Sequence, residues 1–155
     1  MQAVLLHCYL KKLPQLQLLH VSGLELGSSD LVHFTKLTTL TDFKIAHCRG
    51  ELDLGIAAIM QRLTGLQALH LESLELSSPL IWVAAADLTN LQVLKCVLCS
   101  GIAVTDDTLH LLAPLTKLTH LVLDDPEAYE QQDVSAHVVR RLLRQLPLLQ
   151  DIEWV

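Results

Sequence analysis

Aliphatic residues recur along this chain at spacings that repeat roughly every 25 residues. The segment 63–76, LTGLQALHLESLEL, matches the segment 13–26, LPQLQLLHVSGLEL, at eight of fourteen positions, and the matching residues are mostly leucines. Because leucines recur rather than polar groups, the repetition predicts a duplicated structural unit and not a duplicated binding site. One apolar position can be aligned through six units, at Leu19, Phe43, Leu69, Leu94, Leu121 and Ile152.

Each unit combines two hydrophobic periods. Around the aligned residue, apolar and polar positions alternate, which predicts a strand with one buried face. The segments between these strands have helical spacing and typical helix starts. In 77–87, SSPLIWVAAAD, Ser78 suits a helix cap and Pro79 a first helical position, and 28–30 and 105–107 are expected to start helices in the same way. The order strand, turn, helix and return predicts an α/β fold.

A single unit of this kind cannot bury both its strand face and its helix face. Neighbouring units must therefore stack, with the aligned residues forming one continuous aliphatic core. The chain has 155 residues, 51% of them hydrophobic and about a quarter leucine, which suffices for one core of this kind. We expect a single domain over residues 1–155.

The pattern L-x-x-L-x-L-x-x-(N/C)-x-L describes these units. It is matched by Leu66, Leu69, Leu71, Leu74 and Leu76, and by Leu40, Phe43, Ile45 and Cys48. The whole chain resembles the leucine-rich repeat family. Because its ninth positions hold leucine or cysteine in most units and never asparagine, it is most similar to the intracellular cysteine-containing and ribonuclease-inhibitor-like types. The resemblance implies a solenoid of about five to six repeats, with a curved parallel sheet on the concave face and helices on the convex face.

Charge and hydropathy narrow the choice of partners. The formal net charge is −6, from 11 Lys and Arg against 17 Asp and Glu, so we do not expect nucleic acid as a partner. No apolar run approaches the ~18–20 residues that cross a bilayer, so we expect no membrane partner.

The four cysteines are Cys8, Cys48, Cys96 and Cys99, and a Cys-x-x-Cys spacing of the last two leaves core, zinc and redox roles open. The repeat phase favours buried core thiols, because it places Cys96 on the inner side of a strand and Cys99 at the ninth position. Reduced core thiols suit a cytoplasmic location.

Catalytic and metal-binding motifs are not found in the sequence. The eight histidines form no H-E-x-x-H or H-x-x-x-H pair, and there is no glycine-rich phosphate loop or nucleophile elbow. We therefore expect no enzyme activity, no metal site and no cofactor.

The strand residues that point away from the core are the candidate binding surface, because no helix should cover them. Four consecutive units place His20, Lys44, His70 and Lys95 in the middle row of this surface. Such a row predicts attraction of an acidic or amphipathic segment of a partner protein, and its histidines predict binding that strengthens as pH falls through about 6.5. The predicted partner-binding residues are His20, Asp42, Lys44, His70, Glu72, Lys95, His120 and Val122.

The function that follows is a non-enzymatic protein-interaction module, such as an adaptor, a substrate-recognition subunit or an assembly subunit. The resemblance also implies an alternative, an enzyme regulator such as an inhibitor or a small-GTPase activator, for which an exposed arginine such as Arg49 is the marker. The segment 124–133 lengthens the last unit and is expected to be either a contact loop or a solvated insertion. The helix-like start at 3–12 and the final strand predict a piece of a longer repeat array, or a subunit whose ends partner subunits cover.

Overall fold

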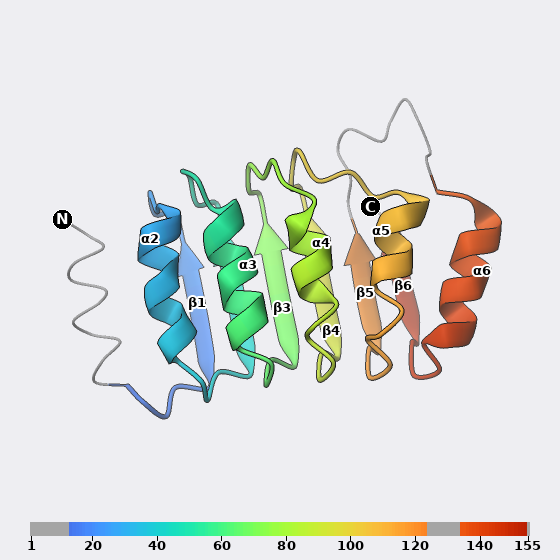
Figure 1. Ribbon diagram of the computed structural model, residues 1–155, viewed down its shortest axis with the longest axis horizontal. Helices are drawn as coiled ribbons and strands as arrows, with labels where there is room; N and C mark the ends of the chain where they lie inside the picture. The colour runs from blue at the N-terminus through green and yellow to red at the C-terminus, as the bar shows by residue number, and fades with distance from the viewer. Residues whose placement is uncertain (1–12, 124–133, 155) are drawn as a thin grey trace.

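A computed structural model describes residues 13–123 and 134–154. Its α/β fold has one six-stranded parallel sheet in which the strands follow chain order, and the helices lie together on one side of that sheet (Figure 1). The strands are β1 (Leu18–Ser22), β2 (Asp42–Ala46), β3 (Ala68–Glu72), β4 (Val93–Val97), β5 (His120–Leu123) and β6 (Asp151–Trp154). The helices are α2 (Ser28–Leu31), the 3-10 helix η1 (Val32–Lys36), α3 (Asp53–Arg62), α4 (Leu80–Ala85), α5 (Asp106–Leu111) and α6 (Ala136–Gln145).

The strand register confirms the alignment drawn from the sequence. Leu19 pairs with Phe43, and the same row continues through Leu69, Leu94, Leu121 and Ile152. The four central members of this row are at most 1% exposed, whereas the members on β1 and β6 are only partly buried. Each end strand has one described neighbour, and this explains the difference.

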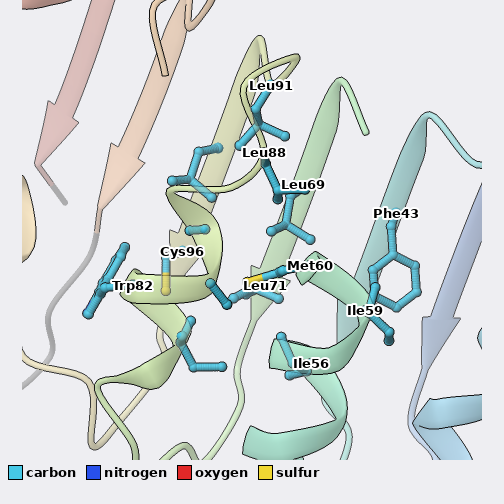
Figure 2. Packing of buried hydrophobic residues seen from close by; sticks show 14 of the residues in the cluster. Phe43, Ile56, Ile59, Met60, Leu69, Leu71, Trp82, Leu88, Leu91 and Cys96 are labelled. Carbon is cyan, nitrogen blue, oxygen red and sulfur yellow. The ribbon is translucent and has the colours of Figure 1, made fainter. Parts of the chain in front are cut away.

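Helices and strands meet in a dry aliphatic layer. Figure 2 shows side chains of α3, including Ile59 and Met60, directed at Phe43 and Leu71 of the sheet, and all four are buried. Trp82 of α4 fills the corresponding space next to Cys96 (Figure 2). Each such buried side chain contributes roughly 1.5–3 kcal/mol of hydrophobic free energy, so the repeated layer is the main source of stability.

The cysteine positions agree with the core interpretation. Cys48, Cys96 and Cys99 are all buried, and no disulfide joins them. The thiols of Cys48 and Cys99 lie 3.4 Å and 3.5 Å from the carbonyl oxygens of Ala46 and Val97, two residues earlier. These contacts close the turns that follow β2 and β4. Cys8 lies outside the described residues.

One helix start follows the sequence prediction and two differ. α4 begins at Leu80 with Pro79 in the cap position, one residue later than predicted, although the Ser78 hydroxyl still accepts a hydrogen bond from the Leu80 amide. α5 begins as predicted, with Thr105 as its cap. Residues 28–30, in contrast, form the first turn of α2 rather than preceding it, because Gly27 takes the extended cap position. The Asp30 carboxylate then accepts a hydrogen bond from the Gly27 amide (2.9 Å).

Carboxylates at two helix starts join consecutive units. Asp53 accepts hydrogen bonds from the amides of Ser77 and Ser78, both at 2.8 Å. Asp106 accepts from the Ser135 amide and from the Ser135 hydroxyl, both at 2.7 Å. The two bonds from Ser135, with the hydroxyl contributing most, lower the pKa of Asp106. These contacts fix the spacing between successive helices.

Backbone contact between units is closest at two glycines. A Cβ atom on Gly50 would lie 2.1 Å from the Leu26 carbonyl oxygen, and one on Gly101 would lie 1.7 Å from the Leu76 carbonyl oxygen. Both glycines also have positive φ angles, of 117° and 75°. Only glycine fits these two positions without a shift of the backbone.

Candidate functional site

The surface of interest is the side of the sheet opposite the helices, which we call the open face. It consists of the strand residues that alternate with the buried row. In its middle row, His20, Lys44, His70 and Lys95 occupy register-paired positions on β1 to β4. Adjacent strands lie about 4.8 Å apart, so neighbouring members of this row can bind one ligand group together.

Apolar side chains flank the middle row. Leu18 on β1 is 52% exposed, and Val93 and Val97 on β4 are partly exposed. Apolar area beside charged groups is the usual composition of a protein-binding surface. Asp124 and Val155, which the alternation also assigns to this face, lie outside the described residues.

Acidic side chains on neighbouring strands lie close to two members of the middle row. His20 Nε2 lies 3.5 Å from Asp42 Oδ1, and the Lys44 ammonium forms an ion pair with Glu72. His47 Nε2 also lies 3.8 Å from Glu72 Oε1. The open face is therefore a mixed charged surface and not a row of four unopposed cations.

Lys95 differs from Lys44 in this respect. In the described part of the chain, Lys44, His20 and His47 have a carboxylate within 4.0 Å, and Lys95 has none. The side chain of Lys95 is partly exposed and lies on β4 directly beside His70 of β3. As far as the described residues go, Lys95 is thus the cation of the row that is available to an external anion.

The surroundings shift the pKa of two groups on this face. The hydrogen bond from Lys44 is the largest cause that lowers the pKa of Glu72, so this acid is ionised at neutral pH. Burial is the largest cause that lowers the pKa of His70, and the charges of Lys95 and Lys44 act in the same direction against an opposing effect of Asp42. His70 is consequently neutral at pH 7.

His120 and Val122 complete the predicted residues, and they differ in exposure. His120 is exposed on β5, with its Nδ1 atom 2.9 Å from the Thr119 hydroxyl. Val122 is only 7% exposed, although it belongs to the middle row. Its register neighbours are Lys95 and Glu153, whose side chains are longer. Val122 therefore keeps little exposed area that a partner could contact.

Metal-binding clusters and membrane-spanning helices are absent from the described residues. Within 13–123 and 134–154, no group of three or more His, Cys, Asp or Glu side chains could hold a metal ion. None of the helices in these ranges is both long enough and apolar enough to cross a membrane. The predicted helix at 3–12 and the predicted contact loop at 124–133 lie outside these ranges.

Sequence reasoning placed the eight predicted residues by strand alternation but missed the ion pairs between them. His47 was also missed as a neighbour of this surface, because it lies just after β2 rather than within it. Its positive φ of 52° turns the chain at this point, and the His47 amide donates a 2.9 Å hydrogen bond to the Glu72 carbonyl oxygen. A comparison with known proteins identifies neither a matching family model nor a matching curated relative.

Proposed function

We propose that this chain is a non-enzymatic protein-interaction module of the leucine-rich repeat type, whose open face binds a segment of a partner protein. The observation that carries the proposal is the in-register row of lysine and histidine side chains on a sheet face that no described helix covers. In this proposal the sheet is the inner face of a solenoid, and the repeats hold the row rigidly. A rigid row lowers the conformational entropy lost when a partner binds.

The flanking apolar side chains support the same proposal. Leu18 and Val93 offer hydrophobic contact on one side of the middle row and Val97 on the other, which provides affinity while the charges provide orientation. An extended segment that runs across β1 to β4 would meet both kinds of residue. The roles that this proposal includes are those of an adaptor, a recognition subunit or an assembly subunit.

A second candidate function is regulation of an enzyme, as an inhibitor or a small-GTPase activator. Arg49 supports it, because its side chain is exposed and it follows β2 in a short bridge to Glu25. An exposed arginine supplied in trans is the group that stabilises the transition state of GTP hydrolysis in activated GTPases. An Arg49→Ala variant that binds a GTPase normally but no longer accelerates GTP hydrolysis would establish this second function.

The test of the first proposal compares two variants with equal changes of charge. Lys44→Glu/Lys95→Glu reverses charge on the open face, and Lys36→Glu/Arg141→Glu reverses it on η1 and α6, on the helix side of the sheet. Circular dichroism first establishes that both variants fold. Partners captured from a native extract by the unmodified chain are then purified and titrated against all three proteins.

We expect the open-face variant to bind about tenfold more weakly and the helix-side variant to bind within about twofold of the unmodified chain. Equal loss in both variants, or loss only in the helix-side variant, would contradict binding through the open face.

A further inference from the structure

The difference between the two lysines of the open face points to a specific partner chemistry. Lys44 is already ion-paired with Glu72, whereas Lys95 has no carboxylate within 4.0 Å among the described residues. Both lysines flank His70 at register-paired positions, one on each side. Within the described part of the open face, one neutralised cation and one available cation therefore lie on the two sides of a single imidazole.

We propose that the Lys95 ammonium and the His70 imidazole together bind one carboxylate side chain of an extended, acidic segment of a partner protein. This inference rests on the proposed function, because it names the chemistry that the open face recognises. The strand spacing of about 4.8 Å allows one carboxylate to accept a hydrogen bond from each of two neighbouring side chains. A charge-assisted pair of this kind is stronger than a neutral hydrogen bond.

Glu72 gives this site its selectivity along the row. Because Glu72 neutralises Lys44, a second carboxylate placed over Lys44 would meet a negative charge at close range. The acidic side chain of the partner is thus directed to the Lys95 side of His70. Val93 and Val97, two residues on either side of Lys95 along β4, offer apolar contact to the neighbouring residues of the segment.

Binding of the carboxylate is linked to protonation of His70. In the free protein the imidazole is neutral at pH 7, because burial, Lys95 and Lys44 all lower its pKa. Two other groups also act on His70. Asp42 on β2 raises the pKa of the imidazole, and His20 on β1 lowers it. Glu72 lies on the same strand as His70.

A bound carboxylate adds a negative charge next to the imidazole and raises its pKa, so the complex takes up a proton. Linkage then requires that affinity increases as pH falls, by at most about tenfold per pH unit for one proton.

The test uses short random peptides displayed on phage and selected against the folded chain at about pH 6. We expect the unmodified chain to select peptides with Asp or Glu at one fixed position. The Lys95→Gln variant is expected to lose this preference, and the matched variant Lys36→Gln, which alters an exposed lysine on η1, to keep it. A synthetic copy of the selected peptide with Gln in place of the acid should bind the unmodified chain about tenfold more weakly.

The proton linkage is measured on the same synthetic peptide by titration between about pH 6 and pH 8. Affinity for the unmodified chain should rise several-fold toward the lower pH. The affinity of His70→Gln should not change with pH. The affinity of His20→Gln should depend on pH as steeply as that of the unmodified chain. NMR titration of the His70 ring should show a higher pKa with the acidic peptide bound than with its Gln counterpart.

Two outcomes overturn the proposal while leaving the proposed function intact. One is an acidic preference that survives in Lys95→Gln, and the other is selection of neutral peptides whose binding is lost on Val93→Ser. If no selected peptide depends on any open-face residue, both the inference and the proposed function fail.

Discussion

Lys44 on β2 forms an ion pair with Glu72 on β3, the strand that follows it in the sheet. The two residues are not directly opposite each other, since Lys44 pairs in register with His70 and Glu72 pairs with Ala46. This diagonal contact leaves Lys95 as the available cation of the described open face. The charge pattern of the face thus depends on how side chains cross between strands, as well as on which residues the strands contain.

Replacement of Glu72 by glutamine is predicted to lower stability modestly at neutral pH. The pair is about one third exposed, so the expected loss is at most about 1 kcal/mol, and it should shrink in high salt. Because the pKa of Glu72 is lowered in the folded state, its contribution exists above the ordinary glutamate pKa and disappears as pH falls through the lowered value. Urea unfolding at about pH 7 and about pH 3 measures both effects.

The control for this prediction is Glu75→Gln, which alters an exposed acid just after β3. It should change stability by less than about 0.5 kcal/mol at either pH. Equal stability of Glu72→Gln and the unmodified chain at neutral pH would show that the ion pair contributes nothing to folding.

Three glycine-to-alanine variants distinguish the stability cost of a positive φ angle from the cost of a clash between neighbouring units. Gly65 has an ordinary φ and no atom within 4 Å of an added Cβ, so Gly65→Ala should cost less than about 0.5 kcal/mol. Gly23 has a φ of 68° and open space, so Gly23→Ala should cost about 1–2 kcal/mol. Gly101 combines a φ of 75° with the Leu76 carbonyl oxygen at 1.7 Å, so Gly101→Ala should cost clearly more.

Chemical denaturation of the three variants gives the order directly. If Gly101→Ala lost no more stability than Gly23→Ala, the close approach of Gly101 to the Leu76 carbonyl oxygen would not constrain the stacking of units.

Asp106→Ala is predicted to lower the melting temperature and to flatten its pH dependence on the acid side. The carboxylate accepts two hydrogen bonds from Ser135, which lower its pKa, so its contribution is present above the ordinary aspartate pKa and lost as pH falls through the lowered one. Asp107→Ala is the matched control, since Asp107 is exposed in the same first turn of α5. Similar melting curves for the two variants from about pH 2 to pH 7 would contradict a link between α5 and α6 through Asp106.

The buried row should be far more sensitive to truncation than the open face. Phe43 is fully buried on β2, with its ring centroid 6.0 Å from that of Phe34, so Phe43→Ala should cost about 3–5 kcal/mol. Leu18 on β1 is 52% exposed, and Leu18→Ala should cost less than about 0.5 kcal/mol. Comparable losses in the two variants, measured by urea unfolding, would contradict the assignment of the two faces.

The sequence predicts the sheet well because one physical requirement recurs in every unit. The row from Leu19 to Ile152 must be buried, and this fixes both the strand alternation and the register between strands. Helix starts are less certain, since several neighbouring residues can serve as caps. Residues 28–30 are all good cap residues, yet the cap position falls on Gly27, one residue before them. Gly27 has the extended backbone that a cap residue needs, and Ser28 is already helical.

The candidate site is predictable only in part. Alternation places Lys44, Lys95 and Glu72 on the open face, but it does not say which lysine the acid contacts. That choice depends on side-chain rotamers across two strand gaps, which hydrophobic periodicity does not specify. The burial of Val122 is missed for a related reason, because exposure within an outward row depends on the length of the neighbouring side chains.

The central claim, that the partner binds to the open face, is tested most directly by photo-cross-linking from two valines on opposite sides of the sheet. Val93 on β4 belongs to the open face, whereas Val83 on α4 is 51% exposed on the helix side. Each is replaced in turn by p-benzoylphenylalanine, and the folded variants are irradiated with the captured partner. We predict a cross-linked product from position 93 and none from position 83. A product from position 83, with none from position 93, would contradict binding through the open face.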